Sequence, residues 1–126
     1  MKKIITIPRI TDSRGNLAVI ENGVFPYDIK RVYYLHDVPI GAYRGGHAHK
    51  ECVELLIAVS GSFEVVLDNG ITKERVTLNK PSEGLLIDVH TWRELENFSS
   101  GSVCLVLASH EYDEQDYIRN YEEFIG

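Results

Sequence analysis

Two histidines separated by a single residue, His47 and His49, are the first candidates for chemistry in this sequence. In a β-strand, residues two positions apart face the same side, so both imidazoles would project together while Ala48 projects away. A neutral imidazole can accept or donate a proton near neutral pH, and it can also ligate a metal. The pair therefore predicts either an acid/base site or a metal site built on a strand.

The spacing around this pair resembles the first motif of the cupin barrels, because it reads Gly41, five residues, His47-Ala48-His49, four residues, Glu54, six residues, Gly61. In the second cupin motif a histidine normally completes a metal site, but Arg93 stands in its place here. An arginine cannot ligate a metal, and its fixed positive charge repels a cation. We therefore predict a proton-transfer site without a metal. The alternative is a metal held by the two histidines with Glu54, or with His90 as a substitute ligand.

Short strands must position these side chains. Runs rich in Val, Ile, Leu and Tyr alternate with Gly, Asn, Asp and Pro, a pattern typical of an all-β sandwich or barrel. Asp68-Asn69-Gly70 predicts a hairpin turn, and residues 111–124 carry apolar side chains at the spacing of a short amphipathic helix. The fold class predicted is an all-β cupin (jelly-roll) barrel with a short C-terminal helix. The predicted strands are Leu17–Ile20, Ile29–Leu35, Gly45–His49, Val53–Ser60, Gly61–Leu67, Glu74–Leu78, Gly84–Ile87 and Val103–Ser109.

Length and composition predict one domain over residues 1–126, with 44% hydrophobic residues to form its core. The net charge of −6 argues against binding nucleic acid through a basic surface. Cys52 and Cys104 lie in apolar runs without the companions of a zinc site or a disulfide framework, which indicates buried thiols in a reducing compartment. No segment is long enough for a signal peptide or a membrane span. We therefore expect a cytoplasmic protein.

Most of the sequence also resembles the nucleotide-sugar 3,4-ketoisomerases of the cupin superfamily. The resemblance rests on several segments that occur together and in order: Asp12–Gly15, Ile29–Leu35, Arg44–His49, Leu67–Gly70, Val106–Ser109, Tyr112–Glu114 and Asp116–Arg119. Members of this family act on dTDP-4-keto-6-deoxyglucose in the biosynthesis of deoxyamino sugars for bacterial glycans, such as O-antigen, and for antibiotics. The resemblance implies an isomerase with a dTDP-keto-sugar substrate.

The implied reaction moves a proton between two neighbouring sugar carbons. The C4 carbonyl acidifies the proton on C3, so an imidazole can remove it to form an enediol, and reprotonation at C4 leaves a ketone at C3. By match to the family motif, His47 is the predicted base and His49 its partner. Tyr33 is predicted to hydrogen-bond the developing enediolate. No cofactor is expected, since the carbonyl of the substrate is the electron sink.

Substrate binding is assigned to side chains near the motif. Arg44 is the candidate for the diphosphate, because its planar group suits phosphate oxygens and the adjacent Gly46 lets a ligand approach the backbone. Arg31 shares the face of Tyr33 and is a second candidate. Trp92 offers a surface for thymine stacking or a core side chain.

Two further positions bear on the product. The family varies at Arg14 and Arg93, and this variation goes with the configuration at C4. The chain combines residues of both patterns, so the sequence leaves the galacto and gluco products open. Glu54 stands where the resemblance predicts glutamine, which keeps the metal alternative in view.

Other functions remain open at this point. They are a metal-dependent small cupin enzyme, an epimerase of the same pathway, and a nucleotide-sugar binding module without turnover. For the quaternary structure we expect a homodimer, because cupin barrels leave sheet edges that a second copy can cover. The apolar run Ile4–Ile7 is suited to pairing with the neighbour, which would make the dimer domain-swapped.

Overall fold

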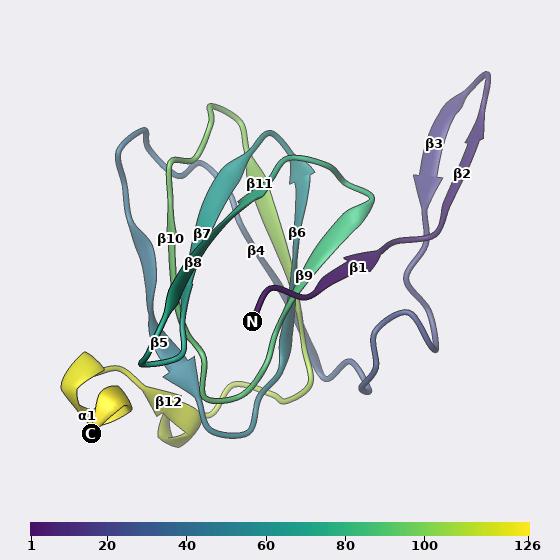
Figure 1. The fold of residues 1–126 in the computed structure, drawn as a ribbon. Coiled ribbons are helices and arrows are strands. Elements are labelled where there is room, and N and C mark those ends of the chain that lie inside the picture. The colour runs from purple at the N-terminus through teal and green to yellow at the C-terminus, as the bar shows by residue number, and fades with distance from the viewer.

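The computed structural model describes residues 1–126 as two five-stranded antiparallel sheets that face each other, with a separate hairpin to one side (Figure 1). The first sheet has the strand order β1 (Ile4–Thr6), β9 (Glu83–Ile87), β6 (Glu54–Ser60), β11 (Val103–Ala108) and β4 (Arg31–Leu35). The second has the order β12 (Tyr117–Ile118), β5 (Arg44–His49), β10 (Trp92–Glu96), β7 (Phe63–Asp68) and β8 (Lys73–Leu78). The all-β expectation is confirmed.

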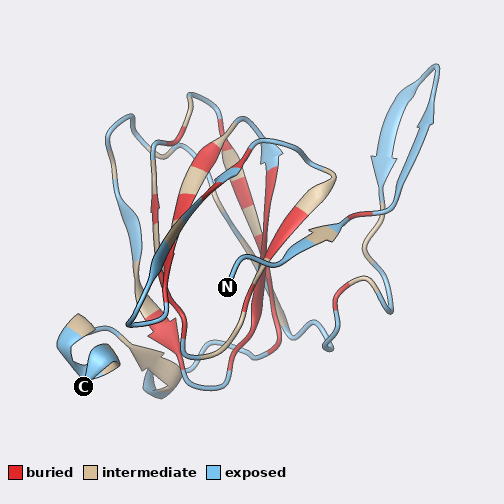
Figure 2. Cartoon of the chain, viewed as in Figure 1, coloured by how far each residue is buried: buried red, intermediate tan, exposed pale blue.

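The core forms where the inward faces of the two sheets meet. In β7, Phe63, Val65 and Leu67 alternate with less buried residues, so one face of the strand is apolar and points inward. Strand β6 is different because it is buried on both faces. Its Leu56 belongs to the core between the sheets, whereas Leu55 joins a second apolar cluster on the outer face. Figure 2 shows the resulting concentration of buried residues in β6, β9 and β11.

This second cluster explains why the sequence of β6 is a continuous apolar run, since both faces of the strand are buried. Ile7 and Phe25, from the N-terminal segment, pack on the outer face of the first sheet and are 1% and 4% exposed. Strand β1 continues this cover by pairing with β9 of the same chain, Ile4 opposite Leu85. The N-terminal run was predicted to pair with a neighbouring chain, and the structure places it on its own sheet instead.

The eight predicted strands all correspond to observed strands, and their ends shift by at most a few residues. The hairpin at Asp68–Gly70 is confirmed, since β7 and β8 pair directly across it. Strands β2 (Arg9–Asp12) and β10 were not predicted. Both carry charged residues at positions where an ordinary strand would show an alternating apolar pattern, so the periodicity gave no signal for them.

The C-terminal segment differs from the single helix predicted over residues 111–124. It consists of a 3-10 turn (Glu114–Asp116), the short strand β12 and the helix α1 (Tyr121–Ile125). Two caps divide it, because the Asp113 side chain accepts a hydrogen bond from the Gln115 amide and the Asn120 side chain accepts one from the Glu123 amide. Between these caps, β12 pairs with β5 and closes the edge of the second sheet.

The hairpin β2–β3 (β3 is Gly15–Ala18) projects away from the two sheets (Figure 1), and all of its strand residues are exposed (Figure 2). Ile10 and Leu17, which lie opposite each other on it, are 60% and 59% exposed.

The helices are all short, and none has the length and apolar character of a membrane span.

Candidate active site

Strand β5 carries the two histidines. Their rings lie edge to face with the centroids 4.9 Å apart, so the prediction that both project to the same side is confirmed. Ala48, between them, lies on the other face, but it is buried rather than exposed. The reason is that β12 pairs with β5 at Ala48 and His49, and helix α1 packs against the same strand.

His47 lies on the wall of a cavity between the sheets. The enclosed part has a volume of about 80 Å³ and also contains Tyr33, Glu54 and Arg93. It shares Tyr33, Arg44 and His47 with a wider polar cleft of about 460 Å³ on the surface. A cleft of this size suits a small organic ligand, and the deep part would receive only one end of it. The site is therefore a small cavity with both apolar and polar walls, which continues into a wider polar cleft at the surface.

A buried ion pair occupies the floor of the enclosed cavity. Arg93 Nη1 donates to Glu54 Oε1 at 2.7 Å, and both side chains are 2% exposed. The Tyr33 hydroxyl donates to the other carboxylate oxygen at 2.7 Å. Burial alone would raise the pKa of Glu54, but the nearby His49 imidazole, the Arg93 charge and the Tyr33 hydrogen bond outweigh it and lower the pKa to about 2. Glu54 is thus a carboxylate held by hydrogen bonds from Arg93 and Tyr33, with the His49 imidazole close by.

This hydrogen bond changes the role expected of Tyr33. Its single hydroxyl proton is directed at Glu54, so it is not offered to a ligand in this arrangement. Burial, together with the negative charge of Glu54, raises the pKa of Tyr33 well above its ordinary value. Tyr33 lines the cavity as predicted, but as a neutral phenol that holds the carboxylate.

His47 is held in the neutral state. Burial, followed by the positive charge of Arg93 and the proximity of His49, lowers the pKa of His47 to about 3. Its Nε2 atom is buried and has no hydrogen-bond partner in the protein. A buried nitrogen without a partner is uncommon in a folded protein. The side chain at the cavity wall is therefore an uncharged imidazole with one ring nitrogen that has no hydrogen-bond partner in the protein.

The lowered pKa predicts how stability depends on pH. Between pH 6.5 and about 3 the unfolded chain binds a proton at this histidine and the folded chain does not, so the free energy of unfolding falls as the pH falls. The contribution of one such group is about 1.4 kcal/mol per pH unit. Urea unfolding at pH 6.5 and 4.5 should show a smaller loss of stability for His47→Asn than for the wild type. Equal losses in the two proteins would contradict the assignment.

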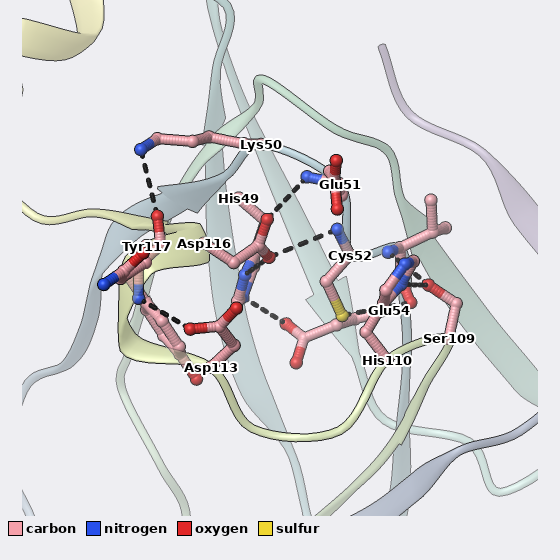
Figure 3. A network of polar contacts seen from close by, with 12 residues as sticks. His49, Lys50, Glu51, Cys52, Glu54, Ser109, His110, Asp113, Asp116 and Tyr117 are labelled. Atoms are coloured by element: carbon pink, nitrogen blue, oxygen red, sulfur yellow. Dashed lines mark hydrogen bonds and ion pairs between the residues drawn. The ribbon is translucent and has the colours of Figure 1, made fainter.

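His49 lies deeper than His47 and contacts two carboxylates. Its Nδ1 is 2.9 Å from Asp116 Oδ2, and its Nε2 is 3.6 Å from Glu54 Oε1 (Figure 3). Asp116 also accepts hydrogen bonds from the main-chain amides of Glu51 and Cys52. Asp116 was not predicted as a site residue, because it is far from the histidines in the sequence and belongs to a segment expected to be helical.

Three arginines surround the mouth of the cavity: Arg31, Arg44 and Arg119 all line the wider cleft. The guanidinium of Arg31 stacks on the Tyr33 ring, 4.4 Å from its centroid. That of Arg119 stacks on the Tyr117 ring at 4.2 Å and pairs with Glu114. Arg44 and Arg31 were predicted to face the site, whereas Arg119 was not. The sequence signal for Arg119 is its place in the Asp116–Arg119 segment, which is part of the family resemblance.

Gly45 belongs to the same cleft and allows β5 to pass close to β10. The pairing of these strands shifts register between Arg93 and Glu94, a β-bulge. Gly45 lies there with φ of +87°, and a Cβ atom would lie 3.0 Å from the Arg93 carbonyl oxygen. Gly46, the predicted contact, instead faces the ring of Tyr43. Gly45, and not Gly46, therefore lines the cleft, and the residue there must be small because β10 passes so close to it.

Two predicted binding residues lie outside the cleft. Trp92 packs against Tyr121 and Phe124 of the C-terminal segment, and its indole nitrogen donates to Glu94. It faces away from the cavity because it precedes the inward-facing Arg93 on the same strand. Arg14 lies at the turn of the projecting hairpin, where it pairs with Asp12 and its side chain is 88% exposed. Within one chain, neither residue reaches the histidines.

The donor set does not suit a divalent cation, although three ligand atoms are close enough to hold one. The ligating atoms of His47, His49 and Glu54 lie within 4.8 Å of one another. However, the guanidinium of Arg93 lies against the only carboxylate of this set and carries a fixed positive charge. His90 contributes nothing to it, because its side chain is exposed on a turn. The residues present fit an acid/base site better than a metal site.

Comparisons with known proteins agree on one family. The family model described as "FdtA: WxcM-like, C-terminal" matches residues 1–126. A TDP-4-oxo-6-deoxy-alpha-D-glucose-3,4-oxoisomerase of Aneurinibacillus thermoaerophilus is 46% identical over 123 residues, which cover 97% of this chain and 88% of the relative.

Solved structures give the same result. A 3,4-ketoisomerase from Helicobacter canadensis superposes with a TM-score of 0.95 at 45% identity, over 98% of this chain and 94% of that one. The sugar 3,4-ketoisomerase QdtA from Thermoanaerobacterium thermosaccharolyticum, in complex with TDP, superposes with a TM-score of 0.96 at 43% identity, over 98% and 91%. A dTDP-4-dehydrorhamnose 3,5-epimerase from Bacillus anthracis, 13% identical over 92% of this chain and 76% of that one, shares the fold at a TM-score of 0.80.

The fold is thus the cupin-type barrel expected from the sequence, and the predicted resemblance is confirmed. The chain belongs to the FdtA (WxcM-like, C-terminal) family and is an enzyme of the sugar 3,4-ketoisomerase type.

Proposed function

We propose that this enzyme converts TDP-4-keto-6-deoxyglucose into a TDP-3-keto-6-deoxyhexose, with His47 as the base that removes the proton from C3. The observation that carries this proposal is the neutral imidazole of His47 on the wall of the cavity between the sheets, with a ring nitrogen that has no hydrogen-bond partner in the protein. The TDP-4-oxo-6-deoxyglucose 3,4-oxoisomerase and the 3,4-ketoisomerases among its relatives support the choice of reaction.

The reaction is a tautomerisation that needs one base and a site for negative charge. His47 takes the proton from C3, and the electron pair of the C–H bond moves to form a C3–C4 double bond while the C4 carbonyl oxygen becomes an enediolate. The proton is then delivered to C4, while the proton of the C3 hydroxyl passes to the C4 oxygen, so that C3 becomes the ketone and C4 carries the hydroxyl. The sugar gains and loses no electrons overall, because C3 is oxidised as C4 is reduced.

Arg93 is placed to stabilise the enediolate. Its guanidinium is buried on the cavity wall, where a positive charge acts more strongly than in water. This assignment takes the role first expected of Tyr33, whose hydroxyl is directed at Glu54. The positive charge of Arg93 therefore has two effects: it lowers the energy of the enediolate, and it keeps His47 unprotonated.

The wider cleft suits the nucleotide part of the substrate. A diphosphate carries negative charge, and Arg31, Arg44 and Arg119 all line this cleft. A chain whose net charge is −6 can bind an anion only where basic side chains gather in this way. The solved complexes of QdtA contain TDP in one case and TDP-4-keto-6-deoxyglucose in another, the latter with a histidine-to-asparagine mutant.

Removing the charge of Arg44 should weaken binding of the substrate without changing the chemical step. For Arg44→Gln we expect KM to rise about tenfold, the value of one charge-assisted hydrogen bond, with kcat within about twofold of the wild type. Arg75→Gln is the matched control, since Arg75 pairs with Glu96 outside the cleft. A fall in kcat with KM unchanged would contradict the assignment of Arg44 to the diphosphate.

The proposed function is tested by following TDP-4-keto-6-deoxyglucose with the purified protein by NMR. The proposal requires a new ketone at C3 and an unchanged rate after chelator treatment. Inversion at C5 would identify an epimerase, and binding without conversion would identify a binding module. A rate restored only by a divalent ion would favour the metal-dependent enzyme, for which the proximity of His47, His49 and Glu54 is the favouring observation.

We also infer that residues 1–126 act as one domain and that two copies form a homodimer. The hairpin β2–β3 supports the dimer, because Ile10 and Leu17 expose apolar surface on an arm that its own barrel does not cover. Arg14, at the tip of this arm, would reach a substrate only in the cleft of a second copy. A domain-swapped arrangement follows if the arm packs on the partner. Analytical ultracentrifugation should give twice the mass of the chain, and a monomer at micromolar concentration would contradict the dimer.

The free thiols Cys52 and Cys104, both buried, support a place in the reducing cytoplasm.

A further inference from the structure

We propose that Asp116 is a positioning residue that holds the imidazole of His49 in one tautomer, with the proton on Nδ1 and with Nε2 directed toward Glu54, a residue that lines the active-site cavity. The catalytic consequence rests on the proposed function, whereas the tautomer itself does not.

The hydrogen bonds around Asp116 determine where the proton lies. Its Oδ1 accepts from the Glu51 amide at 2.7 Å, and its Oδ2 accepts from the Cys52 amide at 3.2 Å. Both oxygens are therefore acceptors. Since Oδ2 is also 2.9 Å from His49 Nδ1, the nitrogen must be the donor in that contact. The other ring nitrogen, Nε2, is left without a hydrogen-bond partner.

Asp116 is fixed in this position by the residues that precede and follow it in the sequence. It ends the 3-10 turn whose start is capped by Asp113, and the next residue, Tyr117, pairs with His49 across the edge of the sheet. The Asp116 carbonyl accepts from the Lys50 amide at 3.0 Å. Figure 3 shows the carboxylate between the His49 ring and the amides that follow it. The side chain therefore has little freedom to leave the imidazole.

The surroundings of His49 indicate what this orientation achieves. The groups that face it are His47 on its own strand, Glu54 on β6, Tyr117 on β12 and Asp116 itself. Arg93 of β10 binds Oε1 of Glu54, the same oxygen that His49 Nε2 approaches. The ring therefore lies between two carboxylates, with Asp116 at Nδ1 and Glu54 near Nε2, and a proton that arrives at Nε2 would face Glu54. Asp116 thus prepares His49 to accept a proton, while Arg93 keeps His47 neutral.

Asparagine at this position tests the proposal because it cannot accept at both oxygens. If its amide group faces His49, it donates to Nδ1 and forces the opposite tautomer, and it also opposes the Cys52 amide. If its oxygen faces His49, the amide group opposes the Glu51 amide instead. Asp116→Asn therefore reverses the tautomer of His49 or leaves a main-chain donor unpaired, although the two side chains have nearly the same size.

The experiment measures the imidazole ¹⁵N shifts of His49 in the ligand-free protein, together with kcat and KM. In the wild type we expect Nδ1 to be protonated. For Asp116→Asn we expect a changed Nδ1 shift and a fall in kcat of about 10- to 100-fold, with KM within about threefold. Asp113→Asn is the matched control: it removes a charge from the same turn, keeps a capping side chain and does not touch His49. It should match the wild type in both readouts.

The wild-type spectrum alone can overturn the proposal, whether or not the variant folds. A His49 with Nε2 protonated and Nδ1 bare would contradict it, as would an Asp116→Asn protein with wild-type kcat and an unchanged spectrum. The positioning of His49 and the proposed function can also be refuted independently of each other. A wild type with the predicted tautomer but no turnover would refute the proposed function and support the positioning of His49.

Discussion

Replacement of His47 by asparagine is expected to reduce kcat by roughly 10²- to 10⁴-fold, the usual contribution of a positioned general base. Asparagine keeps a polar side chain of similar reach, but it cannot accept a proton from carbon. The affinity for TDP should stay within about threefold, because the cleft arginines and not the imidazole bind the diphosphate. Turnover is measured by NMR with TDP-4-keto-6-deoxyglucose, and binding is measured by calorimetry with TDP.

The exposed His36 provides the control for this variant. It lies outside the cleft and pairs only with Asp37, so His36→Asn should keep the wild-type kcat. If His47→Asn turned over as fast as the wild type, another group would have to be the base. If it lost TDP binding as well as turnover, the effect of the substitution would be on the shape of the cleft.

Replacement of Arg93 by methionine is expected to destabilise the fold by about 3–5 kcal/mol, because it leaves the carboxylate of Glu54 buried without its counter-charge. Methionine fills part of the same volume, so the loss is chiefly electrostatic. The double variant Glu54→Gln/Arg93→Met should recover at least about 1 kcal/mol of this loss, since a neutral amide costs less to bury than a charge. Urea unfolding at pH 7 measures both values.

Arg75→Met is the matched surface substitution. Arg75 also pairs with a carboxylate, but its side chain is 50% exposed, and such pairs contribute at most about 1 kcal/mol. Arg93→Met with a loss as small as that of Arg75→Met would show that the buried pair is not important for stability. A double variant less stable than the single one would contradict the electrostatic explanation.

The histidine site was predictable from the sequence because it depends on one strand. A spacing of two places His47 and His49 on one face of any strand, and the observed ring contact follows from that alone. The position of Arg93 followed from its register in the cupin motif. The same alternation would have predicted that Trp92 faces away from the cavity, because it is the neighbour of Arg93 on the strand.

The second half of the site could not be predicted in this way, since it depends on where the C-terminal segment docks. Tyr117 and Asp116 reach His49 only because β12 adds to the edge of the second sheet. The apolar spacing of residues 117–124 suited a helix, but two capping side chains and this edge pairing override that local preference. The direction of the hairpin that carries Arg14 is likewise set by its connection to the barrel, which no local pattern describes.

Incorporation of solvent deuterium into the sugar measures the proposed proton transfer directly. TDP-4-keto-6-deoxyglucose is incubated with the enzyme in D₂O and followed by NMR, with His47→Asn in a parallel sample. The account predicts deuterium at C4 of the product and exchange at C3 of the substrate with the wild type, and neither with the variant. Deuterium at C5, or equal incorporation with and without His47, would contradict it.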